Sequence, residues 1–159
     1  MAANKALGIE RGPTYTQMRS GAQGPAVVEV AYRLGGGLDP EVSFLASGVS
    51  LYRRIVGVAL GREDWEQAQQ EERGHGGAIG SFIIAKPGKV VAIEGIEEAT
   101  SLEGVVDVAV YRRVGDVVFP LTDGSKRAGH VVAFGEDRQQ AEERAAAARA
   151  LVRIVTEEE

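Results

Sequence analysis

Two runs in which apolar and polar residues alternate lie near the start of the chain, TYTQMRS at 14–20 and PAVVEVAYRL at 25–34. A Gly-bearing turn separates them, which predicts an antiparallel β-hairpin. With the turn centred near Gln23, Gln17 lies opposite Glu29 and Arg19 lies opposite Val27. Because side chains alternate between the faces of a strand, one face carries an apolar set suited to a core. This set consists of Met18, Val28, Val30 and Leu34.

In the segment after the hairpin, apolar residues recur at helical spacing. Residues 38–48 predict a helix with Asp39 as its N-cap and Pro40 at the first helical position. Residues 50–61 predict a second helix, which Ser50 caps. The other segments of this part are expected as a short helix at 2–10 and a polar helix or loop at 62–73.

After a Gly-rich break at 74–80, short apolar runs alternate with turns. The runs on either side of the Pro-Gly pair at 87–88 predict a hairpin over residues 81–95. Asp137 is the expected N-cap of a long helix over 137–155. The elements expected between them are a short helix at 96–104, a half-buried strand at 105–118 and a strand at 129–136.

Together these elements predict an α+β fold in which antiparallel hairpins pack with helices. The Gly-rich break suggests two parts, residues 1–73 and a small β-rich α+β domain at 74–159. At 159 residues, of which 44% are hydrophobic, the chain is long enough to bury a core.

Charge and residue usage exclude several classes of protein. The net charge of −5, with both signs mixed along the chain, argues against a nucleic-acid partner. No apolar run has the length of a membrane span, and the first residues lack the pattern of a secretory signal. The absence of cysteine excludes disulfides and thiolate metal sites. We therefore expect a cytoplasmic protein without a membrane partner.

The second face of the hairpin carries the candidate chemistry. Gln17 and Glu29 place an amide oxygen and a carboxylate opposite each other, with Cβ atoms about 5 Å apart. Mg²⁺ can take one or two such oxygens and fill its other positions with water and phosphate. Arg33 follows on the same face and could stabilise a phosphoryl group, while Gly35, Gly36 and Gly37 let backbone N–H groups approach a ligand.

A simpler interpretation of these residues stays open. Glu29 and Arg33 are also what a solvated strand face contains, and the three glycines could form only a loose turn. Elsewhere, His75 and His130 have no acidic partner at ligand spacing, so each is expected as an ordinary loop or strand residue. The YRR triplets at 52–54 and 111–113 are charged sides of a helix and a strand, or sites for an acidic substrate. SKR at 125–127 is expected as a turn, and AKPGKV at 85–90 lacks the neighbours of a biotinyl or lipoyl lysine.

The stretch ALGIERGPTYTQMRSGAQGPAVVEVAYRLGGG at 6–37 resembles the metal-bearing hairpin of ATP-grasp ligases. This superfamily includes biotin carboxylase, glycinamide ribonucleotide synthetase, carbamoyl phosphate synthetase and the L-amino acid ligases. SGVSLYRRIVGVALG at 47–61 is similar to the helix that follows the hairpin in these enzymes. Residues 85–148 are similar to the carboxyl-terminal domain of the amino-acid-ligase-like branch. The resemblance thus covers nearly the whole chain.

The resemblance implies that Gln17 and Glu29 are metal ligands and that Arg33 steadies an acyl-phosphate. It also implies that Gly35, Gly36 and Gly37 line the site. Ala31 departs from the family pattern, which has Asn there, and Gln17 is uncharged where the pattern allows an acidic ligand.

By the same resemblance, residues 1–73 are the late part of the catalytic domain, and the portion that carries the ATP lid is missing. The implied cofactors are ATP and Mg²⁺, and the implied substrates are a small carboxylate and an amine or ammonia. Partners would be the missing portion, encoded as a split gene or cut away, or further copies of the chain. We expect no catalysis by the chain alone. The alternative is a non-catalytic binding or assembly module that kept the fold and lost the chemistry.

Overall fold

The computed structural model of the chain describes residues 2–62 and 76–157. It divides into two compact units. Unit 1 comprises Met1–Phe44 and Gly48–Arg73, and unit 2 comprises Leu45–Ser47 and Gly74–Glu159. The α+β class and the antiparallel sheets are confirmed. The interpretation of residues 1–73 and 74–159 as parts of two functional domains stays a prediction. Residues 63–73 of the polar segment and His75 lie outside the described residues.

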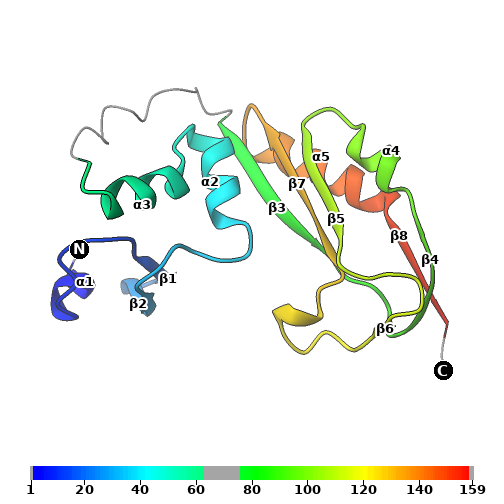
Figure 1. Cartoon of the computed structure of the whole chain (residues 1–159), viewed down its shortest axis with the longest axis horizontal. Helices are drawn as coiled ribbons and strands as arrows, with labels where there is room; N and C mark the ends of the chain where they lie inside the picture. Colours follow the sequence, from blue (N-terminus) through cyan, green and yellow to red (C-terminus); the bar gives the residue numbers. More distant parts are fainter. Residues whose placement is uncertain (1, 63–75, 158–159) are drawn as a thin grey trace. The chain divides into compact units, whose positions relative to one another are not determined.

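Unit 1 contains the predicted hairpin (Figure 1). Gln17 lies opposite Glu29 as predicted, but a register shift between Gln17 and Met18 brings Arg19 opposite Ala26 rather than Val27. Such a bulge adds one residue to one strand and cannot be foreseen from alternation. The elements of this unit are α1 (Ala2–Ala6), β1 (Tyr15–Gly21), β2 (Gly24–Ala31), α2 (Asp39–Ser47), whose last three residues belong to unit 2, and α3 (Leu51–Ala59).

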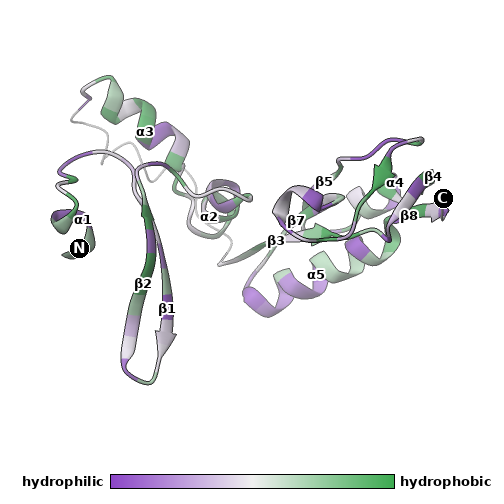
Figure 2. Ribbon diagram, turned by 90° about the horizontal axis from the view of Figure 1, so that it is seen from below, coloured by the Kyte–Doolittle hydropathy of each residue, from purple (hydrophilic) through white to green (hydrophobic). Residues whose placement is uncertain are grey.

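The apolar face predicted for the hairpin does not form a core in the structure. Met18 is 59% exposed and Val28 is 55% exposed. Figure 2 accordingly colours part of β2 as hydrophobic although these side chains are open to solvent. An apolar hairpin face left open in this way is a surface that a further protein segment could cover.

The two helices of unit 1 begin differently. Ser50 caps α3 as predicted, because its hydroxyl accepts a hydrogen bond from the Arg53 N–H at 3.3 Å. Asp39 does not cap α2, and this prediction is wrong. Leu38 occupies the N-cap position with a left-handed φ of 79°, following Gly37 with a φ of 66°, so Asp39 is already helical.

Unit 2 contains two three-stranded antiparallel sheets, with strand orders β3-β7-β5 and β6-β4-β8 (Figure 1). The hairpin predicted over 81–95 is wrong, because β3 pairs with β7 whereas β4 pairs with β6 and β8. The strands are β3 (Gly77–Ile83), β4 (Gly88–Glu94), β5 (Val105–Val110), β6 (Val117–Val118), β7 (Gly129–Gly135) and β8 (Arg153–Glu157). The helices are α4 (Ile96–Thr100), the short 3-10 helix η2 (Gly124–Lys126) and α5 (Arg138–Leu151).

Two further predicted elements of unit 2 need correction. The helix predicted to reach 155 ends at Leu151, since the following residues pair with β4 as strand β8. Its predicted cap is confirmed, with the Asp137 carboxylate accepting from the Gln140 N–H at 2.8 Å. The strand predicted over 105–118 is broken into β5 and β6 by a turn in which Gly115 has a φ of 97°.

The core of unit 2 lies between the β3-β7-β5 sheet and α5, which crosses one face of the sheet (Figure 1). Small residues make the close approach possible. Ala141, Ala145 and Ala148 are fully buried on one face of α5, at helical spacing. A Cβ atom at Gly135 would lie 2.7 Å from the Ala141 nitrogen, so β7 needs glycine there.

No single helix among the described residues is long and apolar enough to cross a membrane, although α2 and α3 pass the same test as a bent pair.

Candidate functional site

The candidate site lies on the face of the hairpin that carries Gln17 and Glu29. Both side chains are exposed, and their Cα atoms are register partners across the two strands. Within the described residues, no ion pair joins Glu29 to Arg19 or Arg33. The carboxylate is therefore available to a ligand rather than used in a structural salt bridge.

Arg33 joins this face through Tyr15. The Arg33 Cζ atom lies 5.7 Å from the centroid of the Tyr15 ring. Tyr15 is the register partner of Ala31, two positions from the Gln17–Glu29 pair, so its side chain shares the same face. Arg33 also donates a hydrogen bond from Nη1 to the Leu34 carbonyl at 2.8 Å. Gln17 and Glu29 thus face each other across the two strands, and Arg33 contacts the ring of Tyr15, which shares their face.

The three glycines differ in what surrounds them. A Cβ atom at Gly35 would contact the Asp39 carboxylate and would lie 2.9 Å from Tyr15 Cδ2. Gly35 is thus needed for packing. At Gly36 the same position is open, with no heavy atom within 4 Å. Gly37 adopts a left-handed φ of 66° before α2. Gly36 offers the most open backbone for a ligand.

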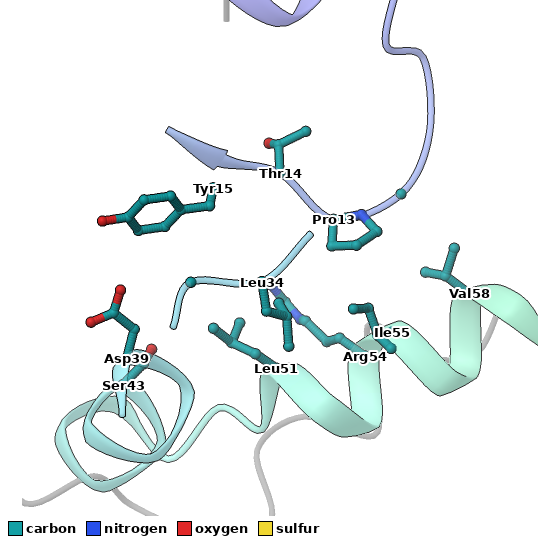
Figure 3. Close-up of a pocket in the computed structure, with 12 residues that line it drawn as sticks. Pro13, Thr14, Tyr15, Leu34, Asp39, Ser43, Leu51, Arg54, Ile55 and Val58 are labelled. Carbon is teal, nitrogen blue, oxygen red and sulfur yellow. The ribbon is translucent and has the colours of Figure 1, made fainter. Parts of the chain in front are cut away.

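A cavity of about 450 Å³ lies beside this loop within unit 1. Figure 3 shows Tyr15 on the side of Asp39 and Ser43 of α2, whereas Leu34 of the loop lies toward Leu51 and Arg54 of α3. The opposite wall comes from α3, where Leu51, Ile55 and Val58 present apolar side chains beside Arg54. The cavity therefore combines an apolar wall with a carboxylate and a guanidinium.

The donor set is small for a metal ion. No group of three or more His, Asp or Glu side chains in the described residues could hold one. Gln17 and Glu29 supply two facing oxygens, and Ala31 supplies none. Two protein oxygens fit the needs of Mg²⁺, which usually keeps several waters and binds phosphate oxygens as well. Gln17 and Glu29 are the residues that would hold it, and the ion would offset phosphate charge there.

A second polar cluster, in unit 2, was missed in the sequence. His130 is buried and lies between Asp107 and Tyr111. Its Nε2 lies 2.7 Å from Asp107 Oδ2, and its Nδ1 lies 2.5 Å from the Tyr111 hydroxyl. The carboxylate can only accept, so Nε2 donates, and in the neutral imidazole Nδ1 accepts from Tyr111. His130 is a residue of strand β7 as expected, but pairing of β5 with β7 brings Asp107, which is distant in sequence, beside its ring.

The basic residues near this cluster make structural contacts. Arg112 donates to the carbonyls of Ser125 and Arg127 at 3.4 and 3.5 Å. The Arg127 guanidinium lies 3.6 Å from the centroid of the Phe82 ring. The turn predicted at SKR is confirmed as η2, where Asp123 accepts from the Ser125 N–H. Recognition of an acidic substrate by either YRR triplet stays a prediction.

The chain is similar to a known protein family and to several solved structures. Residues 81–157 match the family model described as L-amino acid ligase C-terminal domain 2. The resemblance to the carboxyl-terminal part of ATP-grasp ligases is confirmed. Phosphoribosylglycinamide synthetase from Anaerococcus prevotii has the same fold, with a TM-score of 0.82 at 16% identity over 98% of this chain. The L-amino acid ligase from Bacillus licheniformis follows with a TM-score of 0.80 at 24% identity, also over 98%.

Two curated relatives extend the comparison. The uncharacterized protein y4rH of Sinorhizobium fredii is 35% identical over 87% of this chain. Dapdiamide A synthase of Enterobacter agglomerans is 24% identical over 82%. The chain spans only 28% and 32% of the lengths of these two relatives, and 39% and 38% of the two solved structures.

Proposed function

We propose that the chain is part of an ATP-dependent carboxylate–amine ligase that acts through an acyl-phosphate. Glu29 would coordinate Mg²⁺ with Gln17 assisting, and Arg33 would steady the acyl-phosphate. Gly35, Gly36 and Gly37 would line the acceptor side of the site. The substrates would be a small carboxylate and an amine or ammonia.

One observation carries this proposal: Gln17 faces Glu29 in the hairpin register, and Arg33 stands on the same face over Tyr15. A hard cation and a guanidinium on one face are suited to the charge that develops when a phosphoryl group is transferred. The relation to an L-amino acid ligase domain and to dapdiamide A synthase supports an amide-forming reaction.

The chain spans a minor share of its relatives, so a complete site would need a further portion of the ligase, which carries the ATP lid. That portion, or a second copy of the chain, is the proposed partner. The open apolar face at Met18 and Val28 is where such a partner would bury surface. The chain alone should therefore bind ATP with Mg²⁺ weakly or not at all, and a micromolar dissociation constant in calorimetry would contradict this.

Substitution of Glu29 by Gln tests the metal role. Glu29 is exposed and makes no salt bridge with Arg19 or Arg33, so the variant should keep its free energy of unfolding within about 0.5 kcal/mol. In a complex reconstituted with the lid-bearing portion, ATP-dependent ligation should fall by orders of magnitude, because a catalytic metal contributes several kcal/mol. Glu98→Gln makes the same chemical change at an exposed residue of α4 and should leave activity unchanged.

The competing proposal is a non-catalytic binding or assembly module. Ala31 favours it, because it supplies no oxygen at the position where the resemblance expects one. Under that proposal, Glu29→Gln would change neither stability nor any activity of a reconstituted complex. Loss of stability with unchanged activity would instead show that Glu29 is a structural residue.

A further inference from the structure

Tyr15 and Arg33 form a contact that neither the hairpin ladder nor chain proximity requires. The guanidinium carbon lies 5.7 Å from the ring centroid, which is within the range of a cation–π interaction. The residue opposite Tyr15 is Ala31, whose small side chain leaves the space over the strand to the ring. Ala31, where the resemblance expects Asn, thus lies in the same part of the surface as the Tyr15–Arg33 contact.

The Tyr15 ring is itself held in place by the loop after β2. Its Cδ2 atom lies 2.9 Å from where a Cβ at Gly35 would stand, so any larger residue at Gly35 would displace the ring. The Asp39 carboxylate packs against the same side of Gly35. Tyr15 is half-buried by these contacts, whereas Arg33 is exposed. A ring held by packing therefore lies beside an exposed guanidinium.

We propose that Tyr15 is a positioning residue that holds the Arg33 guanidinium over the face shared by Gln17 and Glu29. The consequence for an anion rests on the proposed function, in which Arg33 meets an acyl-phosphate. Tyr15 touches none of the reacting atoms and acts only through Arg33.

The chemistry of the contact explains why a ring would be used there. A carboxylate partner would neutralise Arg33 and occupy its N–H groups. A ring engages the flat face of the guanidinium and leaves the N–H groups at its edge free to donate to an anion. Within the described residues Arg33 pairs with no carboxylate, and its hydrogen bond to the Leu34 carbonyl uses only Nη1. The remaining N–H groups of Arg33 thus stay available to an anion while the ring holds the guanidinium in place.

Nuclear magnetic resonance of the whole chain tests this proposal. In the wild type, the Arg33 Hδ protons should show an upfield ring-current shift and a nuclear Overhauser effect to the Tyr15 ring. Tyr15→Phe should preserve both signals, and Tyr15→Leu should abolish the shift. Titration with acetyl phosphate in the presence of Mg²⁺, followed at Arg33, should give an affinity about two- to five-fold weaker in Tyr15→Leu than in Tyr15→Phe.

The outcomes separate the proposal from the function on which it rests. An unshifted Arg33 in the wild type, or equal affinity in the Leu and Phe variants, would overturn the positioning role. The Arg33 shift is measured in the wild type, so the proposal can be tested even if the Tyr15→Leu protein does not fold. If the ring-current shift is present and is lost in Tyr15→Leu, but Arg33 does not respond to acetyl phosphate, the positioning role stands and the proposed function loses support.

Discussion

Removal of the Tyr111 hydroxyl should destabilise unit 2 through His130. In Tyr111→Phe, the buried Nδ1 of His130 loses the donor that lies 2.5 Å away, while the ring of residue 111 keeps its packing. Leaving a buried acceptor without a donor destabilises the fold. Because Tyr111 is half-exposed, solvent restores part of the lost hydrogen bond, and the expected cost is about 1–2 kcal/mol. That cost corresponds to a factor of about 5–30 in the equilibrium constant for the opening of unit 2.

A change at Asp107, which accepts from the Nε2 of His130, should destabilise unit 2 less. Asp107→Asn keeps a carbonyl acceptor for Nε2, and the Asp107 side chain is 56% exposed, so solvent screens its charge. The expected cost is therefore below about 1 kcal/mol. We therefore expect Tyr111→Phe to destabilise unit 2 more than Asp107→Asn does.

Native-state hydrogen exchange of the β7 amides measures both effects within one unit. Val131 and Val132 are buried at the centre of the β3-β7-β5 sheet, and their protection should drop five- to thirty-fold in Tyr111→Phe, the range set by the hydrogen-bond cost. Tyr32→Phe is the matched control, because the Tyr32 hydroxyl donates to the Arg11 carbonyl in unit 1. Unchanged β7 protection in Tyr111→Phe, or a larger loss in Asp107→Asn, would show that the Tyr111 hydroxyl does not stabilise unit 2 through His130.

Ala31→Asn adds an oxygen donor beside Glu29 and should tighten Mg²⁺ binding, as measured by calorimetry; unchanged affinity would count against a metal site on this face. Burial and the charge of Asp107 raise the pKa of Tyr111, so the folded chain keeps that proton after the unfolded chain loses it, and stability should fall as the pH rises above about 10. Spectroscopic titration should show tyrosinate forming late at Tyr111 and at Tyr52, where a hydrogen bond to Glu41 raises the pKa, and Tyr111→Phe should remove one of the late steps. The open apolar hairpin face predicts self-association, and light scattering that shows only monomer over a wide concentration range would contradict it.

Local signals in the sequence predicted local structure well. Ser50 and Asp137 were identified as helix caps because capping depends on a side chain and an N–H three residues away. Asp39 has the same chemistry but fails as a cap, since the backbone at Gly37 and Leu38 takes left-handed turns that place it inside the helix. Backbone conformation of this kind is set by the loop as a whole and not by the capping residue.

Pairing between distant strands could not be predicted in the same way. The Pro-Gly pair at 87–88 indicated a hairpin, yet β3 and β4 find their partners in residues that follow much later. The same limit hid the candidate cluster at His130, whose partner Asp107 lies on the strand across the ladder. In the hairpin, by contrast, both strands are adjacent in sequence, and the facing of Gln17 and Glu29 was correctly predicted despite the bulge.

The separation of β3 and β4 into different sheets has a consequence for how unit 2 is made. During synthesis, β3 emerges early but stays unpaired until β7 appears, and β4 has only the two-residue strand β6 as a partner until β8 at residues 153–157 is made. Both early strands thus expose their ladder groups to other chains while the later ones are being translated. A nascent or truncated chain that stops before residue 129 would hold several open strand edges and no complete sheet in this unit, and open edges can pair with other chains.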